Sequence, residues 1–388
     1  MKGHVRQRGK GTWSIVLDMP RGPDGRRRQK WHTVHGTKKN AERELARLIH
    51  EMETGYYVEP TKMTVADLLE QWLTDYAKPN VAGKTYERYQ EIVHKNLIPA
   101  LGHHQLTKLQ PLHIQAFYSD MLDHGRKNSD GGGLSPLTVR HYHRVLRKAL
   151  HDAVRWRLLA RNPAEAADPP QVVRKEMKVL TLVEVTLLLQ SAQDSRFYIP
   201  ILLAVTTGLR RGEILALRWE DVDLDAGMLT VRRSLEQTRS GITFKEPKTP
   251  RSRRMVVLPE ITIGPLRAHK EAQTLQKLML GSAYEDNRLV CTEADGSMIN
   301  PEHLSRGFRV LLKLAELPRI RFHDLRHTHA TILLSEGIPA KVVAERLGHS
   351  TIVLTLDTYS HVLLPMQEEA ARKLDNALRT ASHQDHQE

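Results

Sequence analysis

The chain of 388 residues carries 58 Lys and Arg against 45 Asp and Glu, a formal net charge of +13. This length predicts several domains with separate cores, and the charge favours a polyanionic partner such as nucleic acid. The single cysteine, Cys291, excludes intramolecular disulfides and cysteine-based zinc fingers. No apolar stretch approaches the ~18 residues that span a bilayer, and no apolar signal segment follows the basic start. We therefore expect a cytoplasmic protein without a membrane partner.

Residues 1–60 are locally basic, with 13 Lys and Arg against 7 Asp and Glu, an excess of +6. Residues 12–19, TWSIVLDM, alternate in polarity, and RRQKWHTVH follows at 27–35 after a turn-forming PDG. Residues 38–52 repeat apolar side chains at helical spacing, so a helix can cover one sheet face. We predict a small three-stranded antiparallel sheet plus a helix, with a basic second face for DNA. The candidate DNA contacts flank the strands and are Arg26, Arg27, Arg28 and Lys30.

Residues 63–161 show helical patterns throughout. Thr64 is a candidate N-cap, and Thr85 is another for a helix that Pro99 should end. Ser135 opens the last helix, with a proline at its first helical position. One face of that helix is basic and suits phosphates, although a solvated surface remains the alternative. This face carries Arg140, His141, His143, Arg144, Arg147 and Lys148.

The second half of the chain predicts a mainly α domain. Residues 162–178, which include NPAEAADPP, are typical of a linker. Helical patterns dominate residues 179–364, and short strand patterns between 219 and 259 predict a small antiparallel sheet. The tail, 365–388, repeats apolar residues at helical spacing, so it could pack on a neighbouring protomer or on its own chain. The expected fold class is α+β and multidomain, with a helical bundle between the two sheet-containing domains.

Four separated segments in the 179–364 region carry reactive side chains, namely TTGLRRGEILALRW, EPKTPRSRR, HDLRHTHAT and LGHSTIVLTLDTYSH. Arg210 and Glu213 lie three residues apart on a helix, so the carboxylate can hold the guanidinium in place. His323 and Arg326 share this spacing and can converge on one oxygen-rich group. The last segment contains His349 and, ten residues later, a tyrosine.

These residue types match phosphodiester transesterification without a metal ion. The transition state gathers negative charge on the nonbridging oxygens, which the guanidinium groups of Arg210 and Arg326 can stabilise. Ionising Tyr359 at pH 7 costs roughly 4 kcal/mol, which cations and a base such as His323 must offset. The leaving 5′ hydroxyl needs a proton, and Lys248 could supply it if neighbouring arginines lower its pKa.

In their order, the four segments resemble the boxes of the tyrosine recombinase family, the phage and conjugative-element integrases. The resemblance implies a two-site integrase that binds arm-type DNA through residues 1–60 and core-type DNA through 63–161, and that reacts through 179–364. It implies site-specific recombination through a 3′-phosphotyrosyl intermediate, with no cofactor and no metal. The catalytic residues that it implies are Arg210 with its support Glu213, Lys248, His323, Arg326, His349 and the nucleophile Tyr359.

The resemblance also implies partners. Family members act as a homotetramer on double-stranded DNA attachment sites and exchange strands through a Holliday junction. A DNA-bending host protein and a directionality factor are further expected partners.

Three other functions remain as alternatives. The first is a metal-dependent hydrolase. His323 and His327 are four residues apart as in a zinc-binding helix, but the glutamate of the HExxH motif is absent, which argues against it. A noncatalytic DNA-binding regulator would explain the charge but leaves the four segments as coincidence. A type IB topoisomerase uses similar chemistry on one duplex, and the basic N-terminal unit disfavours it. For His327 and His329 we expect structural roles.

Overall fold

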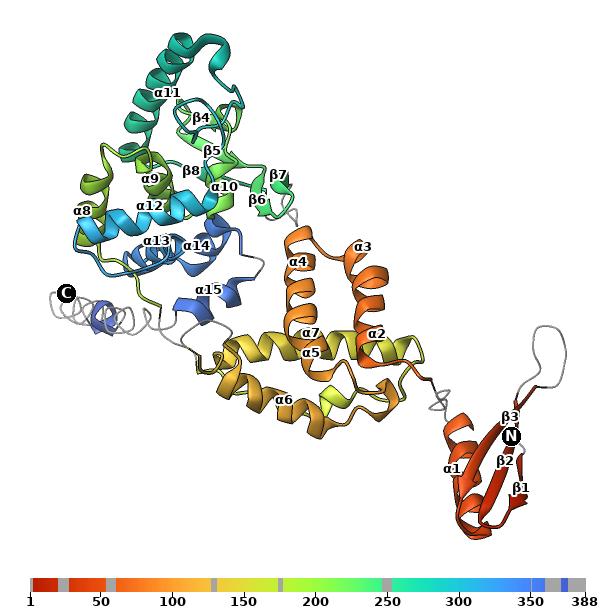
Figure 1. Ribbon diagram of the computed structural model, residues 1–388. Helices are drawn as coiled ribbons and strands as arrows, with labels where there is room; N and C mark the ends of the chain where they lie inside the picture. The colour runs from red at the N-terminus through yellow and green to blue at the C-terminus, as the bar shows by residue number, and fades with distance from the viewer. Residues whose placement is uncertain are drawn as a thin grey trace. The chain divides into compact units, whose positions relative to one another are not determined.

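The computed structural model describes residues 3–19, 28–53, 61–126, 131–173, 177–245, 253–349, 351–359 and 371–375. The chain divides into two compact units, Met1–Arg174 and Lys175–Glu388. Small antiparallel sheets occur among many helices, which confirms the expected α+β multidomain class (Figure 1). None of the helices in the described ranges is long and apolar enough to cross a membrane.

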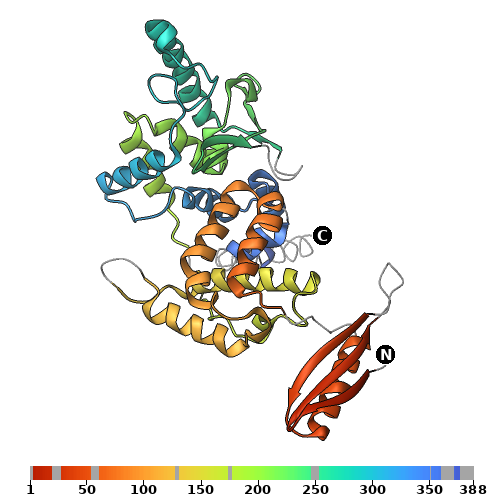
Figure 2. The same ribbon diagram turned by 45° about the vertical axis from the view of Figure 1, so that its right-hand side comes forward.

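The first unit begins with an antiparallel sheet of three strands in the order β1-β2-β3, with α1 packed against one face (Figure 2). Alternation along β2 directs Ile15 and Leu17 to the helix, where they form a small core with Leu48. Gly11 has φ +73°, a conformation that favours glycine, in the turn between β1 and β2. The elements are β1 (Gly3–Gly9), β2 (Thr12–Met19), β3 (Arg28–His35) and α1 (Lys38–Glu53).

A helical bundle follows in the same unit. Thr64 begins it with a capping box, since its hydroxyl accepts from Asp67 N and Asp67 accepts from Thr64 N. Ser135 caps α7 as expected. The elements are α2 (Val65–Gln71), η1 (Trp72–Ala77), α3 (Lys78–Asn80), α4 (Gly83–Ile92), η2 (Val93–Leu97), α5 (Ile98–Leu101), η3 (Leu106–Lys108), α6 (Pro111–His124), α7 (Pro136–Arg155) and η4 (Pro163–Glu165).

Two expectations for this bundle are wrong. Thr85 is not an N-cap, because α4 begins two residues earlier with Ala82 at the cap position. Pro99 does not end its helix, because helical structure continues through α5. The π-helical segment η2 ends two residues before this proline, and η1 ends two residues before Pro79. Proline lacks the N–H and crowds the preceding turn, so the wider π turn lets the helix continue past it.

The bundle core is mainly apolar, and Asp152 is a buried charged group within it. Trp72 is fully buried and donates from Nε1 to Asp152 Oδ2 at 2.8 Å. Lys148 Nζ donates to both carboxylate oxygens of Asp152 at 2.7 and 2.8 Å.

Ala164 and Ala167 also belong to the core of the helical bundle. The structure therefore places residues 163–167, within the range expected to be a linker, in the helical unit.

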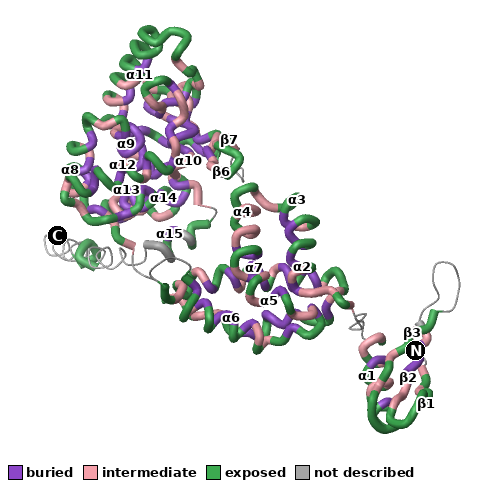
Figure 3. The backbone as a smooth tube through the Cα atoms, in the orientation of Figure 1, coloured by how far each residue is buried: buried purple, intermediate pink, exposed green. Residues whose placement is uncertain are grey.

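The second unit is built around α9, which is apolar on all sides and packs against α8, α10, α11 and α13. Figure 3 shows this helix as mostly buried. Its two sheets have the strand orders β4-β5-β8 and β6-β7. The elements are α8 (Leu182–Ala192), α9 (Tyr198–Thr207), α10 (Arg211–Leu215), η5 (Trp219–Asp221), β4 (Val222–Asp223), β5 (Met228–Val231), β6 (Ser234–Thr238), β7 (Gly241–Lys245), β8 (Arg254–Val257), α11 (Glu260–Leu280), η7 (Gly281–Ala283), α12 (Pro301–Leu314), α13 (Asp324–Ser335), α14 (Ala340–Leu347) and α15 (Ile352–Tyr359).

Gly208 ends α9 and fixes the entry to α10. It has φ +66°, and a Cβ at this position would lie 2.6 Å from the ring of His329. Any larger residue would therefore be strained and would clash with α13. The turn at Gly208 directs the chain into Arg210, the first residue of the candidate site.

Candidate active site

Glu213 holds Arg210 at the start of α10. Its carboxylate accepts from Arg210 N at 2.9 Å and from Arg210 NH1 at 2.8 Å. Arg254, at the start of β8, donates to the same carboxylate at 3.2 and 2.9 Å. Burial raises the pKa of Glu213, but the hydrogen bonds and charges of Arg254 and Arg210 lower it to about 2. Glu213 is therefore ionised at neutral pH and orients two guanidinium groups.

Arg326 hydrogen-bonds to the backbone just before two other candidate residues, Arg210 and His349. It is 3% exposed and donates to Gly208 O at 2.7 Å and to Leu347 O at 2.6 Å. Arg210 NH2 lies 3.4 Å from the neighbouring carbonyl, Gly348 O. Both arginines therefore contact the turn that leads into His349, which brings three of the four sequence segments together.

The two candidate histidines are neutral at pH 7. The pKa of His323 is lowered to about 4 by burial, by His327 and by the charges of Arg326 and Arg210. The pKa of His349 is also lowered to about 4, by burial and then by Arg326 and Arg210. Both arginines thus act on both rings. A neutral imidazole can accept a proton, which suits His323 for general base catalysis.

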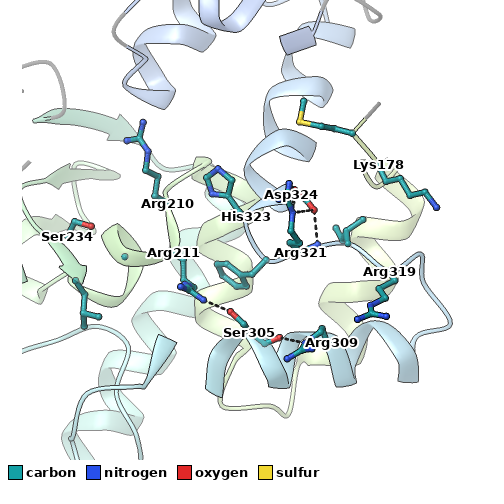
Figure 4. A pocket seen from close by; sticks show the side chains of 15 residues that line it. Lys178, Arg210, Arg211, Ser234, Ser305, Arg309, Arg319, Arg321, His323 and Asp324 are labelled. Atoms are coloured by element: carbon teal, nitrogen blue, oxygen red, sulfur yellow. Dashed lines mark hydrogen bonds and ion pairs between the residues drawn. The ribbon is translucent and has the colours of Figure 1, made fainter. Parts of the chain in front are cut away.

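A pocket of about 970 Å³ opens beside Arg210 and His323. Figure 4 shows these two side chains on one side of it and Arg309 and Arg319 on another. Arg211 donates to Pro301 O at 3.0 Å and to Ser305 Oγ at 2.5 Å, so it joins α10 to α12. The further cationic lining was not predicted, although RIRF, residues 319–322, directly precedes HDLRH in the sequence. It consists of Lys178, Arg211, Arg309, Arg319 and Arg321.

The structure does not describe the side chains of two candidate residues, Lys248 and Tyr359. Lys248 lies outside the described residues, in the segment between β7 and β8. Tyr359 is the last residue of α15, and its side chain is not described. Its helix contacts α14, and Thr355 on it is fully buried. The Thr355 hydroxyl lies 2.8 Å from His349 Nδ1, which places the backbone of α15 beside the site.

His329 has a structural role, as expected. It is 5% exposed, and its Nδ1 lies 2.7 Å from Val205 O while Nε2 accepts from Arg346 Nε at 3.1 Å. His327 packs edge-on against His323, with ring centroids 5.4 Å apart. Within the described ranges, no group of three or more His, Cys, Asp or Glu residues is arranged to hold a metal ion.

The predicted basic face of α7 divides into two kinds of side chain. Arg140 and Arg144 are exposed. Arg147 is exposed too, but its NH2 lies 3.4 Å from Glu165 Oε1. Lys148 is engaged inside the bundle, by Asp152 and by the ring of Tyr76 at 4.1 Å. Lys148 therefore stabilises the bundle, and the arginines are the side chains that face solvent.

The N-terminal sheet places its predicted DNA contacts differently from expectation. Arg26 and Arg27 lie outside the described residues. Arg28 pairs with Met19 and Lys30 with Leu17, so both lie on the side of the sheet that α1 covers. The opposite face carries Trp31, which is 52% exposed, with the Arg8 guanidinium 5.7 Å from its ring centre. Arg6, which pairs with Ser14, is another exposed cationic side chain on this face.

Comparison with known protein families gives two matches. Residues 178–364 match the phage integrase family, and residues 64–122 match the phage integrase N-terminal SAM-like domain. The chain is 28% identical over 396 aligned residues to a protein named tyrosine recombinase XerC-like from Caldanaerobacter subterraneus subsp. tengcongensis, covering 97% of this chain and 98% of that protein. It is 26% identical to the ICEBs1 integrase of Bacillus subtilis, covering 96% and 100%.

Solved structures share the fold. The Tn1549 transposon integrase in complex with a circular intermediate DNA matches with a TM-score of 0.67 and 20% identity, covering 80% of this chain and 99% of that one. A lambda integrase dimer bound to a core site matches with a TM-score of 0.55 and 18% identity, covering 92% and 94%. A lambda integrase tetramer bound to a Holliday junction matches with a TM-score of 0.53 and 19% identity, covering 89% and 95%.

Proposed function

The chain belongs to the phage integrase family of tyrosine recombinases, and we propose that it recombines the DNA of a mobile element through a covalent 3′-phosphotyrosyl intermediate. The observation that carries this mechanism is the convergence of Arg210, Arg326, His323 and His349. Contacts through Glu213, Gly208 and Leu347 hold the arginines in place. Two fixed guanidinium groups and two neutral imidazoles form a site for a phosphodiester whose negative charge increases in the transition state.

In the proposed reaction, the Tyr359 oxygen attacks the scissile phosphorus. A phosphorus–oxygen bond to tyrosine forms, and the bond to the 5′ oxygen breaks. His323 is neutral in the free protein, with a pKa of about 4, and takes the phenolic proton once the negative charge of the bound phosphodiester raises that pKa. Arg210, Arg326 and His349 donate to the nonbridging oxygens.

Lys248 protonates the departing 5′ oxygen in this proposal. Its ammonium group can act as a general acid, and Arg251, Arg253 and Arg254 follow it within six residues of sequence. Rejoining reverses these steps: a 5′ hydroxyl attacks the phosphotyrosine, and Tyr359 leaves. The bond energy is kept in the phosphotyrosine, so no nucleotide cofactor is required.

We assign DNA contacts to each part of the chain. Residues 1–60 bind arm-type sites, 63–161 bind core-type sites, and 162–178 connect them to the catalytic region, 179–364. The exposed arginines of α7 and the cationic pocket supply phosphate contacts. The related lambda integrase forms dimers and tetramers on DNA. A homotetramer on two attachment sites is the corresponding proposal here, with the tail, 365–388, docking between protomers.

The test uses a radiolabelled duplex that carries the candidate attachment site from the DNA beside the gene, nicked near the expected cut. Loss of the short fragment beyond the nick traps cleavage. Wild type should form a slow-migrating adduct at the 3′ phosphate on a denaturing gel without added metal. Tyr359→Phe should form none while binding the duplex equally well. An adduct formed equally by Tyr359→Phe would overturn the assignment of the nucleophile.

The alternatives give different products on a plasmid with two sites. A recombinase yields rearranged circles, whereas a type IB topoisomerase yields relaxed plasmid without rearrangement. A DNA-binding regulator yields neither and forms no adduct. Recombinant circles from wild type alone would support the proposal.

A further inference from the structure

The side chain of His349 is held by the helix that ends in Tyr359. Its Nδ1 lies 2.8 Å from Thr355 Oγ1, and Thr355 is fully buried. Thr355 stands one helical turn before Tyr359 on α15. The turn before His349 is fixed as well, since Gly348 has φ +67°, its own carbonyl accepts from Arg210 and the carbonyl of Leu347 accepts from Arg326. The turn before it thus fixes the backbone of His349, and α15 holds its ring.

The direction of this hydrogen bond and the tautomer of the ring are linked, because a neutral ring carries its proton on one nitrogen only. Burial and the charges of Arg326 and Arg210 keep the His349 ring neutral, so it has one N–H and one lone pair. If the Thr355 hydroxyl donates to Nδ1, the proton lies on Nε2. Nonbridging phosphate oxygens only accept hydrogen bonds, so a ring that serves a phosphate needs its N–H on Nε2.

We propose that Thr355 is a positioning residue for strand cleavage, whose hydroxyl holds His349 in the orientation and Nε2–H tautomer that donates to the scissile phosphate. The proposal rests on the function proposed above for His349. It makes this donor depend on the docking of α15. Helix α15 brings the nucleophile Tyr359 to the site and also orients His349. Undocking of α15 would therefore remove the nucleophile and this phosphate donor together.

Substitutions at Thr355 separate this role from simple packing. Thr355→Val keeps the branched shape and deletes the hydroxyl, and Thr355→Ser keeps the hydroxyl. Thr262 on α11 is also fully buried and serves as the matched control. Its hydroxyl has no hydrogen-bond partner among the described residues, so Thr262→Val should leave cleavage unchanged.

The readout is the single-turnover rate of adduct formation by the full chain on the nicked duplex, with DNA affinity measured separately. Thr355→Val should slow cleavage about three- to tenfold, the value of one hydrogen bond, with DNA affinity unchanged. Thr355→Ser should restore most of the rate. In a His349→Ala background, Thr355→Val should have no further effect, because its target is gone.

A second readout is the tautomer itself. Selective ¹⁵N labelling of histidine should show His349 with its proton on Nε2 in wild type, and a mixture of tautomers in Thr355→Val. An equal loss of rate in both His349 backgrounds, or a wild-type rate for Thr355→Val, would overturn the proposal. These outcomes presuppose an adduct from wild type, so failure of the proposed function is detected separately as its absence.

Discussion

Arg254 and Glu213 form a bidentate ion pair in which each side chain is only 6% exposed. Arg254 Nε also donates to Arg346 O at 2.7 Å, and a Cβ on Gly348 would lie 3.0 Å from its NH1. Arg254 is the first residue of β8, the strand that follows the segment containing Lys248. Its guanidinium thus joins this strand to the helix of Arg210 and to the turn before His349. The relative positions of the catalytic segments therefore depend on this pair.

Removing Arg254 should destabilise the second unit strongly. Arg254→Met leaves the Glu213 carboxylate buried, with Arg210 as its remaining cation, and breaking such a pair costs about 3–5 kcal/mol. For a unit of this size we expect the midpoint of thermal unfolding to fall by about 6–20 °C. The control is Arg233→Met, which likewise removes one of two arginines from a buried carboxylate, Asp221, but whose own side chain is 25% exposed against 6% for Arg254. Equal losses in both variants would contradict a special role for Arg254.

Glu213 also predicts how stability depends on acid. Its pKa is about 2 in the folded state and about 4.5 in the unfolded chain. Its contribution is fully present above pH 4.5 and is lost as the pH falls towards 2, and it amounts to roughly 3 kcal/mol. Urea unfolding of wild type and Glu213→Gln between pH 6 and pH 3 measures it. The stability difference between them should shrink on acidification; a constant difference would rule out this titration as the cause.

The two site histidines should not titrate near neutral pH in the free protein. Each has a pKa of about 4, against about 6.5 for an unfolded histidine. Each therefore lowers the free energy of unfolding progressively as the pH falls from 6.5 to 4, because the unfolded chain binds the proton first. Histidine ring resonances followed from pH 8 to pH 5 should stay constant for His323 and His349. The exposed His124 serves as the reference. A midpoint near 6.5 for either site ring would contradict the buried, cationic setting.

In the helical bundle, substitutions of Lys148 and Arg144 should change different properties: the stability of the bundle for Lys148, and DNA binding for Arg144. Lys148→Met removes a cation from the buried Asp152 and should cost roughly 1–3 kcal/mol of stability, with little change in DNA affinity. Arg144→Gln should leave stability unchanged and reduce the salt dependence of DNA binding by about one phosphate contact. Thermal unfolding and fluorescence anisotropy at several salt concentrations measure the two effects. Weaker DNA binding by Lys148→Met in the absence of unfolding would reverse these assignments.

Local signals in the sequence predicted much of the fold. The caps at Thr64 and Ser135 were correct because each is decided by a side chain three residues from its partner. The errors at Thr85 and Pro99 also have a local origin. Periodicity does not distinguish an α turn from a π turn, so the way the chain passes Pro99 could not be predicted.

For the site, the sequence indicated the residues proposed to carry the chemistry and one residue that positions them, Glu213, but not the other positioning residues. Arg254 was one of several arginines in PRSRR, and only the fold identifies it as the partner of Glu213. Thr355 carries no motif of its own, and its contact with His349 depends on how α15 docks. The basic sheet residues stay a prediction for a related reason, since strand register decides which face each side chain occupies, and shifting it by one residue exchanges the two faces.

That register yields a last prediction for the N-terminal sheet. Trp31 is half-exposed on the open face beside Arg8 and Arg6, whereas Lys30 lies on the side that α1 covers. Arg6→Gln should weaken arm-site binding and lower the salt dependence by about one phosphate contact. Trp31→Ala removes the apolar centre of that face and should weaken binding further, and the matched change Lys30→Gln should have the smallest effect. Binding of the full chain to labelled duplexes tiled across the DNA beside its gene measures all three, with core cleavage as the control for folding. If Lys30→Gln weakened arm binding more than Arg6→Gln, the helix-covered side would have to be the DNA-binding one, and α1 would lie in the interface.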